Sequence, residues 1–480
     1  MHRLTTLAQA AIALSVAPMA ASADLIRSCP EGLNDAPVVP RHIEQADINS
    51  GAITFREVND IGEALFVAKF NACDGQGRPA TTGGGDKRVA DEPAKLRTSA
   101  PDSDACGGCH AQPEPGGAGD FVANVFVLAQ TLDPVTFSVA PEFSNDRNTL
   151  GMHGSGPIEM LAREMTVDLQ SQAAGLPDGE HTLTTKGVDF DVTVSGGEVV
   201  AADGVNADLV VRPFHQAGVV VSLREFTDNA YNHHHGMQAE ERFDLNPAKG
   251  FDPDYDEDGV QRELTIGDIT AATVWQAQLG TPGRVMPRDD ADLAAVEHGE
   301  QLFDDVGCTS CHVPKMVLNS RQFVEPNPFN PPGTCSSAAE GCPDYSFDMT
   351  KDGDKPRLEK GKNGTAIVRA YTDLKRHSLC DEDINFFCNE QLAQGRPDQD
   401  GKPGTEFFLT RKLWDVGNTA PYGHRGDVST IFEAIMFHGG EARASRDAYA
   451  ALSNADQGAV VKFLKTLQVL PAGSDMIVKE

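Results

Sequence analysis

Two short segments of this chain carry the residues that attach haem covalently. Cys106-Gly107-Gly108-Cys109-His110 and Cys308-Thr309-Ser310-Cys311-His312 both have the form Cys-x-x-Cys-His. In c-type attachment the two thiols add to the vinyl groups of the porphyrin, and the adjacent histidine binds the iron. A Cys-x-x-Cys pair alone also occurs in zinc sites and thiol redox proteins, but a histidine directly after both pairs favours haem. The sequence therefore predicts two covalently bound c-type haems, with His110 and His312 as iron ligands.

The beginning of the chain has the features of an export signal. Arg3 precedes an apolar stretch from Leu7 to Met19, and Ala21-Ser22-Ala23 has the pattern of a signal-peptide cleavage site. We expect residues 1–23 to be removed and the mature protein, beginning near Asp24, to be periplasmic. No later run approaches the roughly 20 apolar residues of a membrane-spanning helix, so no membrane span is expected.

The charge of the chain limits the partners to be expected. It has 71 acidic and 40 basic residues and a formal net charge of −31 at pH 7. This excess of negative charge argues against binding to nucleic acid or to anionic membranes, and it favours a basic or dipolar protein partner.

The cysteines outside the two haem motifs are even in number, which in an oxidising compartment predicts disulfides. Cys335 with Cys342 and Cys380 with Cys388 are close enough in sequence to close short loops, which leaves Cys29 for Cys73. The alternative is that some of these cysteines remain buried thiols.

At 480 residues the chain should form at least two domains. We expect a mainly α protein with two cytochrome c-like haem domains, at residues 24–290 and 291–480. In the second domain, the spacing of apolar residues from Leu293 to Phe303 predicts a helix that leads to the haem motif. Ser453 is a plausible cap for a closing helix before Pro471.

The stretch at about residues 166–221 differs from its surroundings. Val188, Phe190, Val192 and Val194 alternate with polar residues, and Gly-rich turns separate such runs. Alternation of this kind is typical of half-buried strands. We therefore predict a small β insert in the N-terminal haem domain.

An internal repeat connects the two halves. Residues 223–236 align without gaps to residues 413–426, with Leu, an acidic residue, Ala, His and Gly at matching positions. Duplication is the simplest explanation, and the alternative is chance similarity between two polar loops.

These features resemble those of the bacterial di-haem cytochrome c peroxidase superfamily. The paired haem motifs, the repeated His-x-Gly turn and the closing helix carry the resemblance over most of the chain. Four further runs are most similar to its di-haem oxidoreductase group, often called thiol oxidoreductase-like. They are His153-Gly154-Ser155-Gly156, His233-His234-His235-Gly236-Met237-Gln238, Tyr371-Thr372-Asp373-Leu374 and His438-Gly439-Gly440-Glu441-Ala442.

The resemblance implies an electron-transfer haem in the C-terminal domain and a peroxidatic haem in the N-terminal domain. The bacterial peroxidases carry a methionine ligand on the electron-transfer iron, and His438 stands at the matching position, counted from His424. Imidazole in place of a thioether lowers the reduction potential of the iron. On a helix beginning at Thr430, His438 would share an apolar face with Ile435. The alternative is a hydrogen-bonded histidine of the core.

The second ligand of the N-terminal iron is less well defined. The resemblance implies a removable histidine from a loop, and His153 in its Gly-rich run matches best. The competing residues are Met152, His215, His234, His235 and Met237. We expect the triple histidine, including His234, to form a polar turn that bonds haem propionates, because its counterpart His424 cannot bind iron if His438 does.

Peroxide chemistry also requires a base and a hydrogen-bond donor near the iron. Glu159 and Glu164, on a helix predicted over residues 158–165, and Gln238 are the candidates. The alternative for the glutamates is an exposed helix surface. Trp275 or Trp414 could lie between the two haems, although burial in the core is the default for tryptophan.

The resemblance also implies a calcium ion between the domains, held in part by the backbone carbonyls of Thr419 and Pro421. The acidic run 254–259 resembles the first half of an EF-hand loop. Thr265, however, stands where the EF-hand requires a bidentate glutamate, so we interpret the run as an acidic turn.

The leading prediction is a periplasmic di-haem peroxidase that reduces hydrogen peroxide with electrons from a small cytochrome c or copper protein. A homodimer is a further expected association. Two alternatives remain open, a high-valent haem oxidase that modifies a protein partner and an electron carrier without catalysis.

Overall fold

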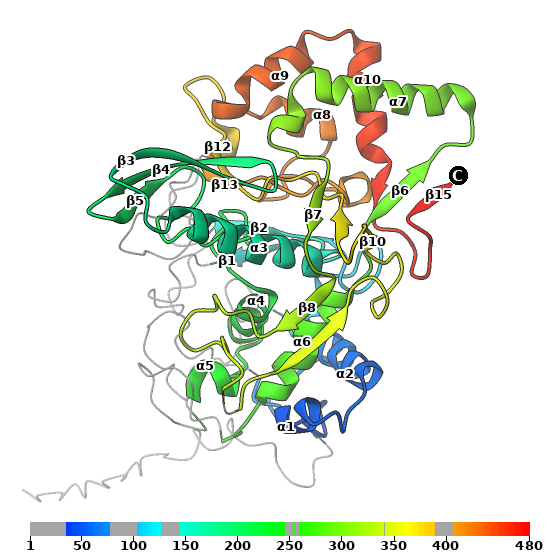
Figure 1. Ribbon diagram of the computed structural model, residues 1–480. Helices are drawn as coiled ribbons and strands as arrows, with labels where there is room; N and C mark the ends of the chain where they lie inside the picture. The colour runs from blue at the N-terminus through cyan, green and yellow to red at the C-terminus, as the bar shows by residue number, and fades with distance from the viewer. Residues whose placement is uncertain are drawn as a thin grey trace, which may run out of the picture.

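The helices form two groups, which we call the two halves and which lie one above the other in Figure 1. The N-terminal half contains α1 to α6 and the C-terminal half contains α7 to α10, and small β-sheets join them. The computed structural model describes residues 35–76, 103–125, 145–244, 254, 259–339, 341–388 and 407–480. The predicted signal peptide, Cys29 and most of the acidic run at 254–259 lie outside these ranges. The α-helices are α1 (Gln45–Asn49), α2 (Phe55–Val67), α3 (Ser155–Ala173), α4 (Leu223–Ala230), α5 (Glu240–Asp244), α6 (Ile266–Gln278), α7 (Asp290–Asp305), α8 (Ile431–Met436), α9 (Arg443–Ala450) and α10 (Asn454–Lys465).

The strands form small sheets that lie between and beside the helices. Three sheets have three strands each, in the orders β3-β4-β5, β10-β11-β7 and β14-β6-β15. The remaining described sheets are the pairs β1-β2, β8-β9 and β12-β13. The bounds are β1 (Gly119–Val125), β2 (Asn145–Thr149), β3 (Gly179–Thr185), β4 (Val188–Ser195), β5 (Glu198–Ala202), β6 (Gly283–Met286), β7 (Met316–Leu318), β8 (Gln322–Glu325), β9 (Tyr345–Asp348), β10 (Glu359–Lys360), β11 (Ala366–Val368), β12 (Arg376–Ser378), β13 (Phe407–Leu409), β14 (Leu467–Gln468) and β15 (Ile477–Lys479).

The prediction of a mainly α protein was wrong. Helices account for 34% and strands for 18% of the structure, which is a mixed α/β fold. Most of the unforeseen strands lie in the long connection between Cys311 and His438. Their alternation is too short to stand out in the sequence: in β8, only Phe323 and Glu325 are buried. Such strands depend on pairing with distant partners rather than on a long periodic pattern.

The helices predicted around the second haem motif are confirmed. Asp289 caps α7 and Ser453 caps α10, each through its side chain. The two helices pack closely, because a Cβ at Gly299 would lie 2.0 Å from the carbonyl oxygen of Ala459. The opening helix α7 and the closing helix α10 of the C-terminal half are therefore in direct contact.

Around the first haem motif, α2 and α6 pack in a similar way. A Cβ at Gly62 would lie 2.2 Å from the carbonyl oxygen of Ala271, so glycine permits the close approach. Thr54 caps α2 and Thr265 caps α6, each in a reciprocal capping box. Thr265 is therefore the N-cap of α6, at the position where an EF-hand loop would need a glutamate ligand.

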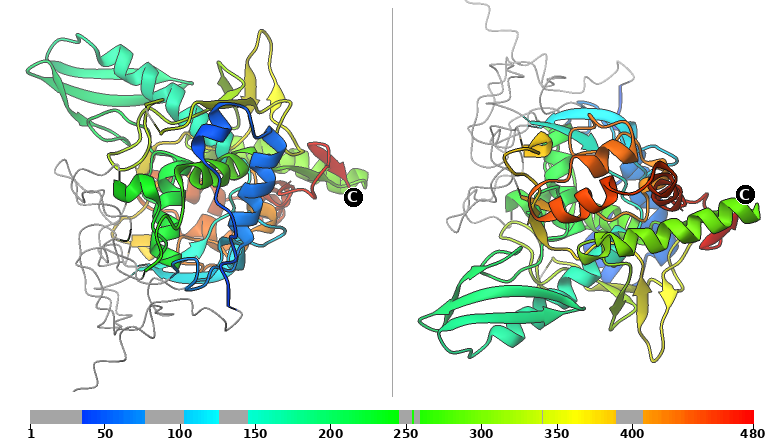
Figure 2. Two further views of the ribbon diagram at one scale, coloured as in Figure 1. Left: turned by 90° about the horizontal axis from the view of Figure 1, so that it is seen from below. Right: turned by 90° about the horizontal axis from the view of Figure 1, so that it is seen from above.

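Strands do form in the predicted β insert, but they span residues 179–202 rather than 166–221. Strands β3, β4 and β5 form an antiparallel sheet that projects from the body of the molecule (Figure 2). Leu183, Phe190 and Val192 are buried on its inner face. Residues 166–173, which we had included in the insert, instead continue α3.

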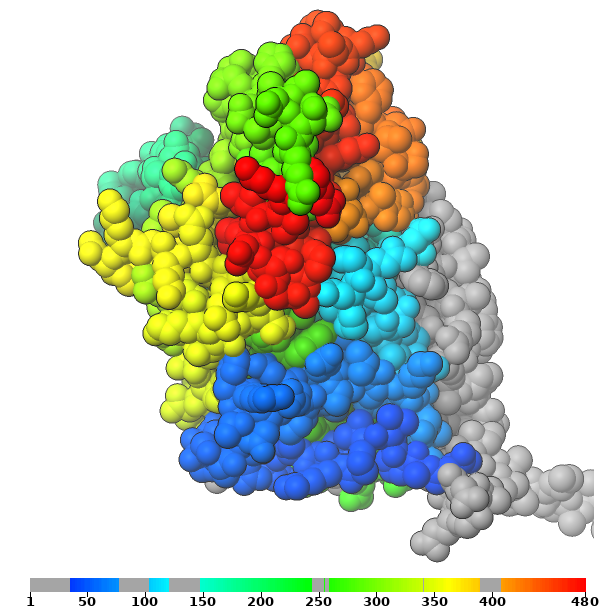
Figure 3. Space-filling view, turned by 90° about the vertical axis from the view of Figure 1, so that its right-hand side faces the viewer, coloured from blue at the N-terminus to red at the C-terminus, as the bar shows by residue number. Residues whose placement is uncertain are grey.

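The C-terminal segment connects the two halves. β15 pairs in parallel with β6, and the backbone N–H of Gly473 donates to the carbonyl oxygen of Lys355 at 3.2 Å. Figure 3 shows this red segment lying against the green α7 and the yellow segment around residue 355.

Two of the three predicted disulfides are present, Cys335–Cys342 and Cys380–Cys388. The third, Cys29–Cys73, cannot be compared, because Cys29 lies outside the described residues. None of the helices in the described part of the chain has the length and apolar character that crossing a bilayer requires.

The predicted repeat exists in a different register. Residues 223–230 form α4, whereas the aligned residues 413–420 contain only the 3-10 turn Val416–Asn418. The segments that share a backbone are 213–225 and 421–433. Each begins with proline, forms a tight turn closed by an isolated β-bridge, and then starts α4 or α8.

Candidate haem sites

The two haem motifs fold alike. Each forms a single 3-10 turn, and the backbone N–H of the motif histidine donates to the carbonyl oxygen of the first cysteine at 3.0 Å, in His110 to Cys106 and in His312 to Cys308. Burial raises the pKa of the Cys106 and Cys308 thiols to about 12. Thiol redox pairs have a lowered pKa, so this environment argues against thiol–disulfide chemistry at either motif.

The motif histidines are held in the form that binds iron. His110 Nδ1–H donates to the carbonyl oxygen of Leu150, and His312 Nδ1–H donates to that of Tyr371, both at 3.0 Å. This arrangement directs the unprotonated Nε2 toward a ligand. Burial lowers the pKa of both histidines to about 4, which keeps each imidazole neutral at physiological pH. The residues present therefore fit a haem iron at each site.

Aromatic side chains support both histidines in the same way. The ring of Phe66 from α2 lies 6.2 Å from that of His110, and the ring of Phe303 from α7 lies 6.2 Å from that of His312. Trp275 packs on Phe66 with ring centres 4.5 Å apart. Trp275 is thus part of the N-terminal haem surroundings.

His438 lies in the C-terminal half, as His312 does. It follows α8, whose predicted start at Thr430 is confirmed by a capping box. Its Nδ1–H donates to the carbonyl oxygen of Ala434 at 2.7 Å, which leaves Nε2 available. After burial, the charge of His438 is among the causes that lower the pKa of His312, so the two imidazoles are close neighbours.

The surroundings of His438 are apolar. The rings of Phe386 and Phe437 stack with centres 4.0 Å apart, and the ring of Phe387 meets that of His438 edge-on at 6.1 Å. Phe387, Phe408 and Val428 form a buried cluster at the same place.

The triple histidine lies at the first haem motif. Residues 231–235 form a π-turn that continues α4 and ends at Gly236, whose φ of +68° suits glycine. His235 donates from Nδ1 to the carbonyl oxygen of Ser103 at 2.7 Å, and its Nε2 lies 3.3 Å from Cys106 Sγ. His234 is near enough to His110 for its charge to lower the pKa of His110, after the larger effect of burial.

His153 lies at a different place. Its Nδ1–H donates to the carbonyl oxygen of Gly280 at 3.2 Å, and its Nε2 is 3.8 Å from a carboxylate oxygen of Glu114. It lines a small pocket with Glu114, Asp354 and Leu470. Burial lowers its pKa to about 4. Its side chain thus contacts the loop after α6 and Glu114, which follows the first haem motif, and its role as an iron ligand stays a prediction.

The glutamates proposed as bases are engaged in structural contacts. Glu159 is buried, and its carboxylate accepts hydrogen bonds from Arg163, from Asn327 Nδ2 at 3.0 Å and from the Leu223 backbone at 2.8 Å. Glu164 accepts from Lys186 Nζ and from the Asn319 and Ser320 backbones, beside the β insert. The structure thus uses both carboxylates to hold α3 in place.

Gln238 is placed differently from the glutamates. Its side chain is buried, and its Nε2 has no hydrogen-bond partner within the described residues. Gln238 stands four residues after His234 in the sequence, and the neighbouring Met237 belongs to the hydrophobic core.

Pro421, one of the two residues predicted to bind calcium, contacts Asn148, which the sequence analysis did not identify. Asn148 donates from Nδ2 to the carbonyl oxygen of Pro421 at 2.9 Å, and its backbone N–H donates to the carbonyl oxygen of His424 at 2.8 Å. Asn148 Oδ1 is buried and accepts no hydrogen bond from the described residues. Thr419 stands two residues before Pro421. Asn148 comes from β2 in the other half, so no local pattern could have identified it.

The ring of His424 packs on Phe408 with centres 5.0 Å apart, and Arg425 Nη1 lies 3.3 Å from its Nε2. It also meets the ring of Phe387 at 6.0 Å, so His424 belongs to the aromatic cluster that contacts His438.

A buried ion pair lies beside His153, between the halves. Lys412 Nζ donates to Asp415 Oδ2 at 2.6 Å and to the carbonyl oxygen of His153 at 3.3 Å. Trp414 packs so closely on the start of α3 that a Cβ at Gly154 would lie 2.1 Å from its Cζ2. Trp414 thus occupies the contact between the two halves, and both tryptophans are buried.

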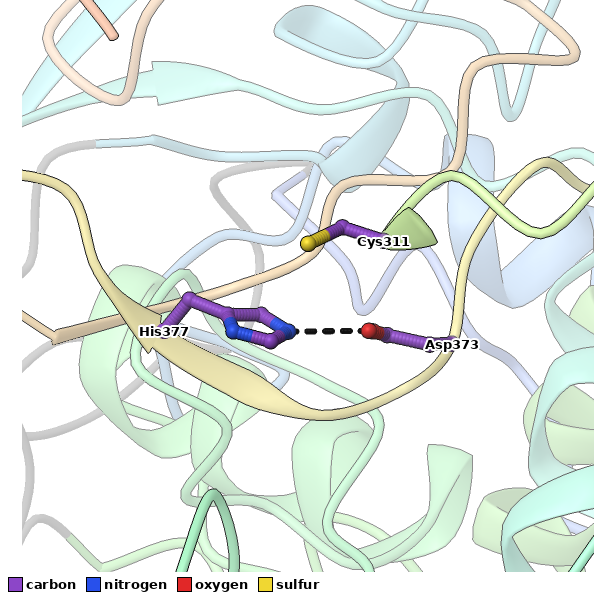
Figure 4. Close-up of side chains that lie close together, drawn as sticks. All are labelled: Cys311, Asp373 and His377. Atoms are coloured by element: carbon purple, nitrogen blue, oxygen red, sulfur yellow. Dashed lines mark hydrogen bonds and ion pairs between the residues drawn. The ribbon is translucent and has the colours of Figure 1, made fainter. Parts of the chain in front are cut away.

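Near the second motif, Cys311, Asp373 and His377 approach one another (Figure 4). His377 Nε2–H donates to Asp373 at 2.8 Å, and its Nδ1–H donates to Glu441 at 2.7 Å. Cys311 belongs to the haem motif, and both ring nitrogens of His377 already hold carboxylates. The group is better suited to placing a cation beside the C-terminal haem than to binding a metal ion.

Part of the C-terminal half matches a known family. Residues 339–467 match the family described as "Di-haem oxidoreductase, putative peroxidase". No curated protein matches the chain. Among solved structures, hydrazine synthase of Kuenenia stuttgartiensis is similar at 12% identity and a TM-score of 0.37, covering 96% of this chain and 100% of that chain. A MauG-like protein associated with microbial copper homeostasis is similar at 16% identity and a TM-score of 0.27, covering 65% of this chain and 88% of the other.

Proposed function

We propose that this chain is a di-haem oxidoreductase that reduces hydrogen peroxide to water at its N-terminal haem site and receives electrons through its C-terminal site. The overall reaction joins H2O2, two electrons and two protons to give two molecules of water. Both haems are proposed to be attached through the thiols of the Cys-x-x-Cys-His motifs, with His110 and His312 on the irons.

The difference in polarity between the two sites carries the proposal. Around His438 the side chains are aromatic and aliphatic. The acid and base described at this motif, Asp373 and His377, already bind each other, and His377 also binds Glu441. Such surroundings suit a site whose only task is to pass electrons.

Around the triple histidine, the chain instead buries polar groups that have no hydrogen-bond partner among the described residues. These are the carboxylate oxygens of Asp228, the hydroxyl of Tyr231 and Nε2 of Gln238. Burial raises the pKa of Asp228 well above its usual value, which favours the protonated carboxyl group. Unsatisfied polar groups in a protein interior are costly, and they are retained mainly where a ligand or a proton transfer uses them.

The roles of these side chains follow from their chemistry. A ferric or ferrous haem supplies the site where peroxide binds and receives electrons. Gln238 can donate a hydrogen bond from its amide to a bound oxygen atom, and Asp228 can hold the proton that the leaving water needs. Glu159 and Glu164 are left to hold α3.

The electron donor is proposed to be a small cytochrome c or copper protein, because a chain with a net charge of −31 attracts a basic or dipolar partner. Export to the periplasm is part of the same proposal, and the two disulfides of the described chain support an oxidising compartment. A homodimer stays a prediction.

We also propose a calcium ion at Asn148, Thr419 and Pro421. Rotation of the Asn148 amide would bring its Oδ1 toward the carbonyl oxygen of Pro421, and two such oxygens are typical calcium ligands. Calcium binding to the haem-loaded protein can be measured by titration calorimetry after chelation. Asn148→Ala should weaken it at least tenfold, and equal affinity in variant and wild type would contradict this site.

The peroxidase proposal is tested by adding hydrogen peroxide to the haem-loaded protein with a reduced small cytochrome c. We expect rapid oxidation of the cytochrome in a ratio of two electrons to one peroxide. Gln238→Leu should lower kcat/KM about 100-fold, as loss of a positioned donor does. Gln301→Leu, on the exposed face of α7, is the matched control and should retain wild-type activity.

A wild-type protein that carries both haems but shows no peroxide turnover would reject the peroxidase function. If such a protein still exchanged electrons with the cytochrome, it would be an electron carrier. Equal turnover in Gln238→Leu and the control would remove Gln238 from the mechanism.

A further inference from the structure

We propose that His377 is a positioning residue of the C-terminal haem site. It ties the turn that holds His312 to the turn that carries His438, and it places a positive charge beside the attached haem that raises the reduction potential of the iron. This inference rests on haem attachment at the second motif, as proposed above, and it does not depend on the reaction at the first motif.

His377 lies next to one of the two points at which this haem is attached. It comes from β12, and one of its ring nitrogens, Cys311 Sγ and a carboxylate oxygen of Asp373 all lie within 4.8 Å of one another. Figure 4 shows the ring of His377 facing the carboxylate of Asp373, with the sulfur of Cys311 beside them. The thioether bond formed at Cys311 makes this sulfur part of the haem group. A charge on His377 is therefore a charge at the attached edge of the haem.

The hydrogen bonds of His377 require a positively charged ring. Its Nδ1 lies 2.7 Å from Glu441 Oε2, and its Nε2 lies 2.8 Å from Asp373 Oδ2. Ionised carboxylates only accept hydrogen bonds, so both ring nitrogens must carry a proton. Burial opposes this charge, but the pKa of His377 is raised above its ordinary value of 6.5, mainly by the hydrogen bond to Asp373. We call Asp373, His377 and Glu441 the charged brace.

Asp373 belongs to the turn that holds the iron ligand His312. Tyr371, two residues before it, accepts the hydrogen bond from His312 Nδ1–H at 3.0 Å. Tyr371 and Leu374 have positive φ values of +54° and +56°, a conformation that is rare for large side chains and is retained mainly at functional sites. The turn thus presents the carbonyl oxygen of Tyr371 to His312 and the carboxylate of Asp373 to His377.

Glu441 belongs to the turn that carries His438. While one of its carboxylate oxygens binds the His377 ring, the other accepts the backbone N–H of Ser378 at 2.8 Å. The two segments run so close together that a Cβ at Gly440 would lie 2.4 Å from the carbonyl oxygen of Ser378. β12 is therefore fastened directly to the turn that carries His438.

The N-terminal site has an apolar residue at the corresponding position. Leu150 accepts the hydrogen bond from His110 Nδ1–H, so it corresponds to Tyr371. Two residues after Leu150 stands Met152, which packs against an apolar cluster. The position of Asp373 in the charged brace is thus taken by a neutral thioether at the first haem.

The charge of His377 has a predictable effect on the iron. Ferrous haem carries one positive charge fewer than ferric haem, so a nearby positive charge favours the reduced form. This interaction is weakly screened in the protein interior. Imidazole ligation by His438 has the opposite effect, because it lowers the reduction potential relative to a thioether ligand. His377 therefore offsets part of the effect of the imidazole ligand.

The test is spectroelectrochemical titration of the haem-loaded protein, which measures both reduction potentials in the absence of peroxide. His377→Gln removes the positive charge and keeps a hydrogen-bond donor. The reduction equilibrium of the C-terminal haem should shift about tenfold toward the ferric form, which is 59 mV for one electron. Glu441→Gln removes a negative charge from the same brace and should shift the equilibrium in the opposite direction.

Two further variants complete the measurement. His298→Gln is the matched control, because His298 pairs with Asp456 at 2.9 Å at an exposed place in the same half, and it should leave both potentials unchanged. Cys308→Ser leaves one thioether bond at the second motif and shifts the absorption bands of that haem, which identifies its component in the titration.

The sign of the shifts separates a charge effect from a loosened site. Shifts of equal sign in His377→Gln and Glu441→Gln overturn the proposal, as do shifts no larger than that of His298→Gln. If His377→Gln does not retain both haems, Asp373→Asn takes its place. It removes a negative charge, so it should raise the potential as Glu441→Gln does, and a fall or no change in either variant overturns the proposal.

Peroxide turnover by the wild type is measured separately. Its absence rejects the peroxidase function and leaves the effect of His377 on the potential standing.

Discussion

Replacing Arg224 with methionine should destabilise the protein strongly, because this guanidinium is the centre of a buried charge network. Arg224 is fully buried at the start of α4. Its Nε donates to the two carboxylate oxygens of Glu241 at 2.8 and 3.0 Å, and its Nη1 donates to Thr270 Oγ1 at 2.9 Å. It also reaches Glu325 and the carbonyl oxygen of Ile266, at 3.3 and 3.2 Å.

The size of the effect follows from what Arg224→Met leaves behind. Methionine fills much of the volume, but the buried carboxylate of Glu241 loses this cation and that of Glu325 keeps only Arg163, at 3.3 Å. Removing one partner of a buried ion pair costs about 3–5 kcal/mol of unfolding free energy. Arg212→Met is the matched control, since Arg212 pairs with Asp208 at a partly exposed site where such pairs contribute about 1 kcal/mol or less.

The pH dependence gives a second measure of the same effect. Burial raises the pKa of Glu325 above its ordinary value of 4.5, and Arg224 opposes this rise. A carboxyl group with a raised pKa in the folded state favours folding in its protonated form, and that contribution is lost as the pH rises through the folded pKa. Without Arg224 the pKa rises further, so the loss of stability should be greater at pH 8 than at pH 5.

Guanidinium denaturation of the haem-loaded protein, followed by far-ultraviolet circular dichroism and the Soret band, measures the unfolding free energy. If Arg224→Met loses no more than Arg212→Met, or loses more at pH 5 than at pH 8, the network does not stabilise α4 as we argue.

Two further predictions concern sites away from the haem ligands. Gly154→Ala should destabilise the protein more than Gly175→Ala. Both glycines have positive φ, which costs about 1–2 kcal/mol for alanine, but only at Gly154 would the added Cβ also meet Trp414. Equal melting temperatures of the two variants would refute the steric argument. The hydrogen bond from His42 to Asp268 at 2.6 Å raises the pKa of His42 above 6.5, although burial opposes it. The stability that His42 adds should therefore be complete below pH 6.5 and be lost as the pH rises through its folded pKa. The unfolding free energies of wild type and His42→Gln should differ by about 0.5–1 kcal/mol at pH 6 and converge as the pH rises to 9. A constant difference across that range would show that the charge of His42 contributes nothing.

The sequence anticipated those parts of the fold that depend on neighbouring residues. The caps at Ser453 and Thr430, the helix before Cys308 and the strands of the β insert all follow from local patterns, and the structure contains them. The short-loop disulfides belong to the same class, because few residues separate their cysteines.

The fold class and the register of the repeat were missed for different reasons. Strands of two to four residues have too little periodicity to be recognised from the sequence alone. The strands between Cys311 and His438 were therefore not predicted. The repeat was aligned on its histidines, whereas the backbone repeats at proline, glycine and the capping residues. Pro213 and Pro421, Gly218 and Gly426, and Ser222 and Thr430 were visible in the sequence and mark the correct register.

By itself, the sequence determined where haem can be attached, because two thiols and an imidazole must stand within five residues to match one porphyrin edge. Only the tertiary structure decided which other side chains meet at those sites. His234 approaches His110, Asn148 reaches Pro421 and Arg224 joins Glu241 to Glu325 through the packing of segments that are far apart in the chain. The energies of these contacts depend on burial and on distance, and neither quantity can be read from the order of residues.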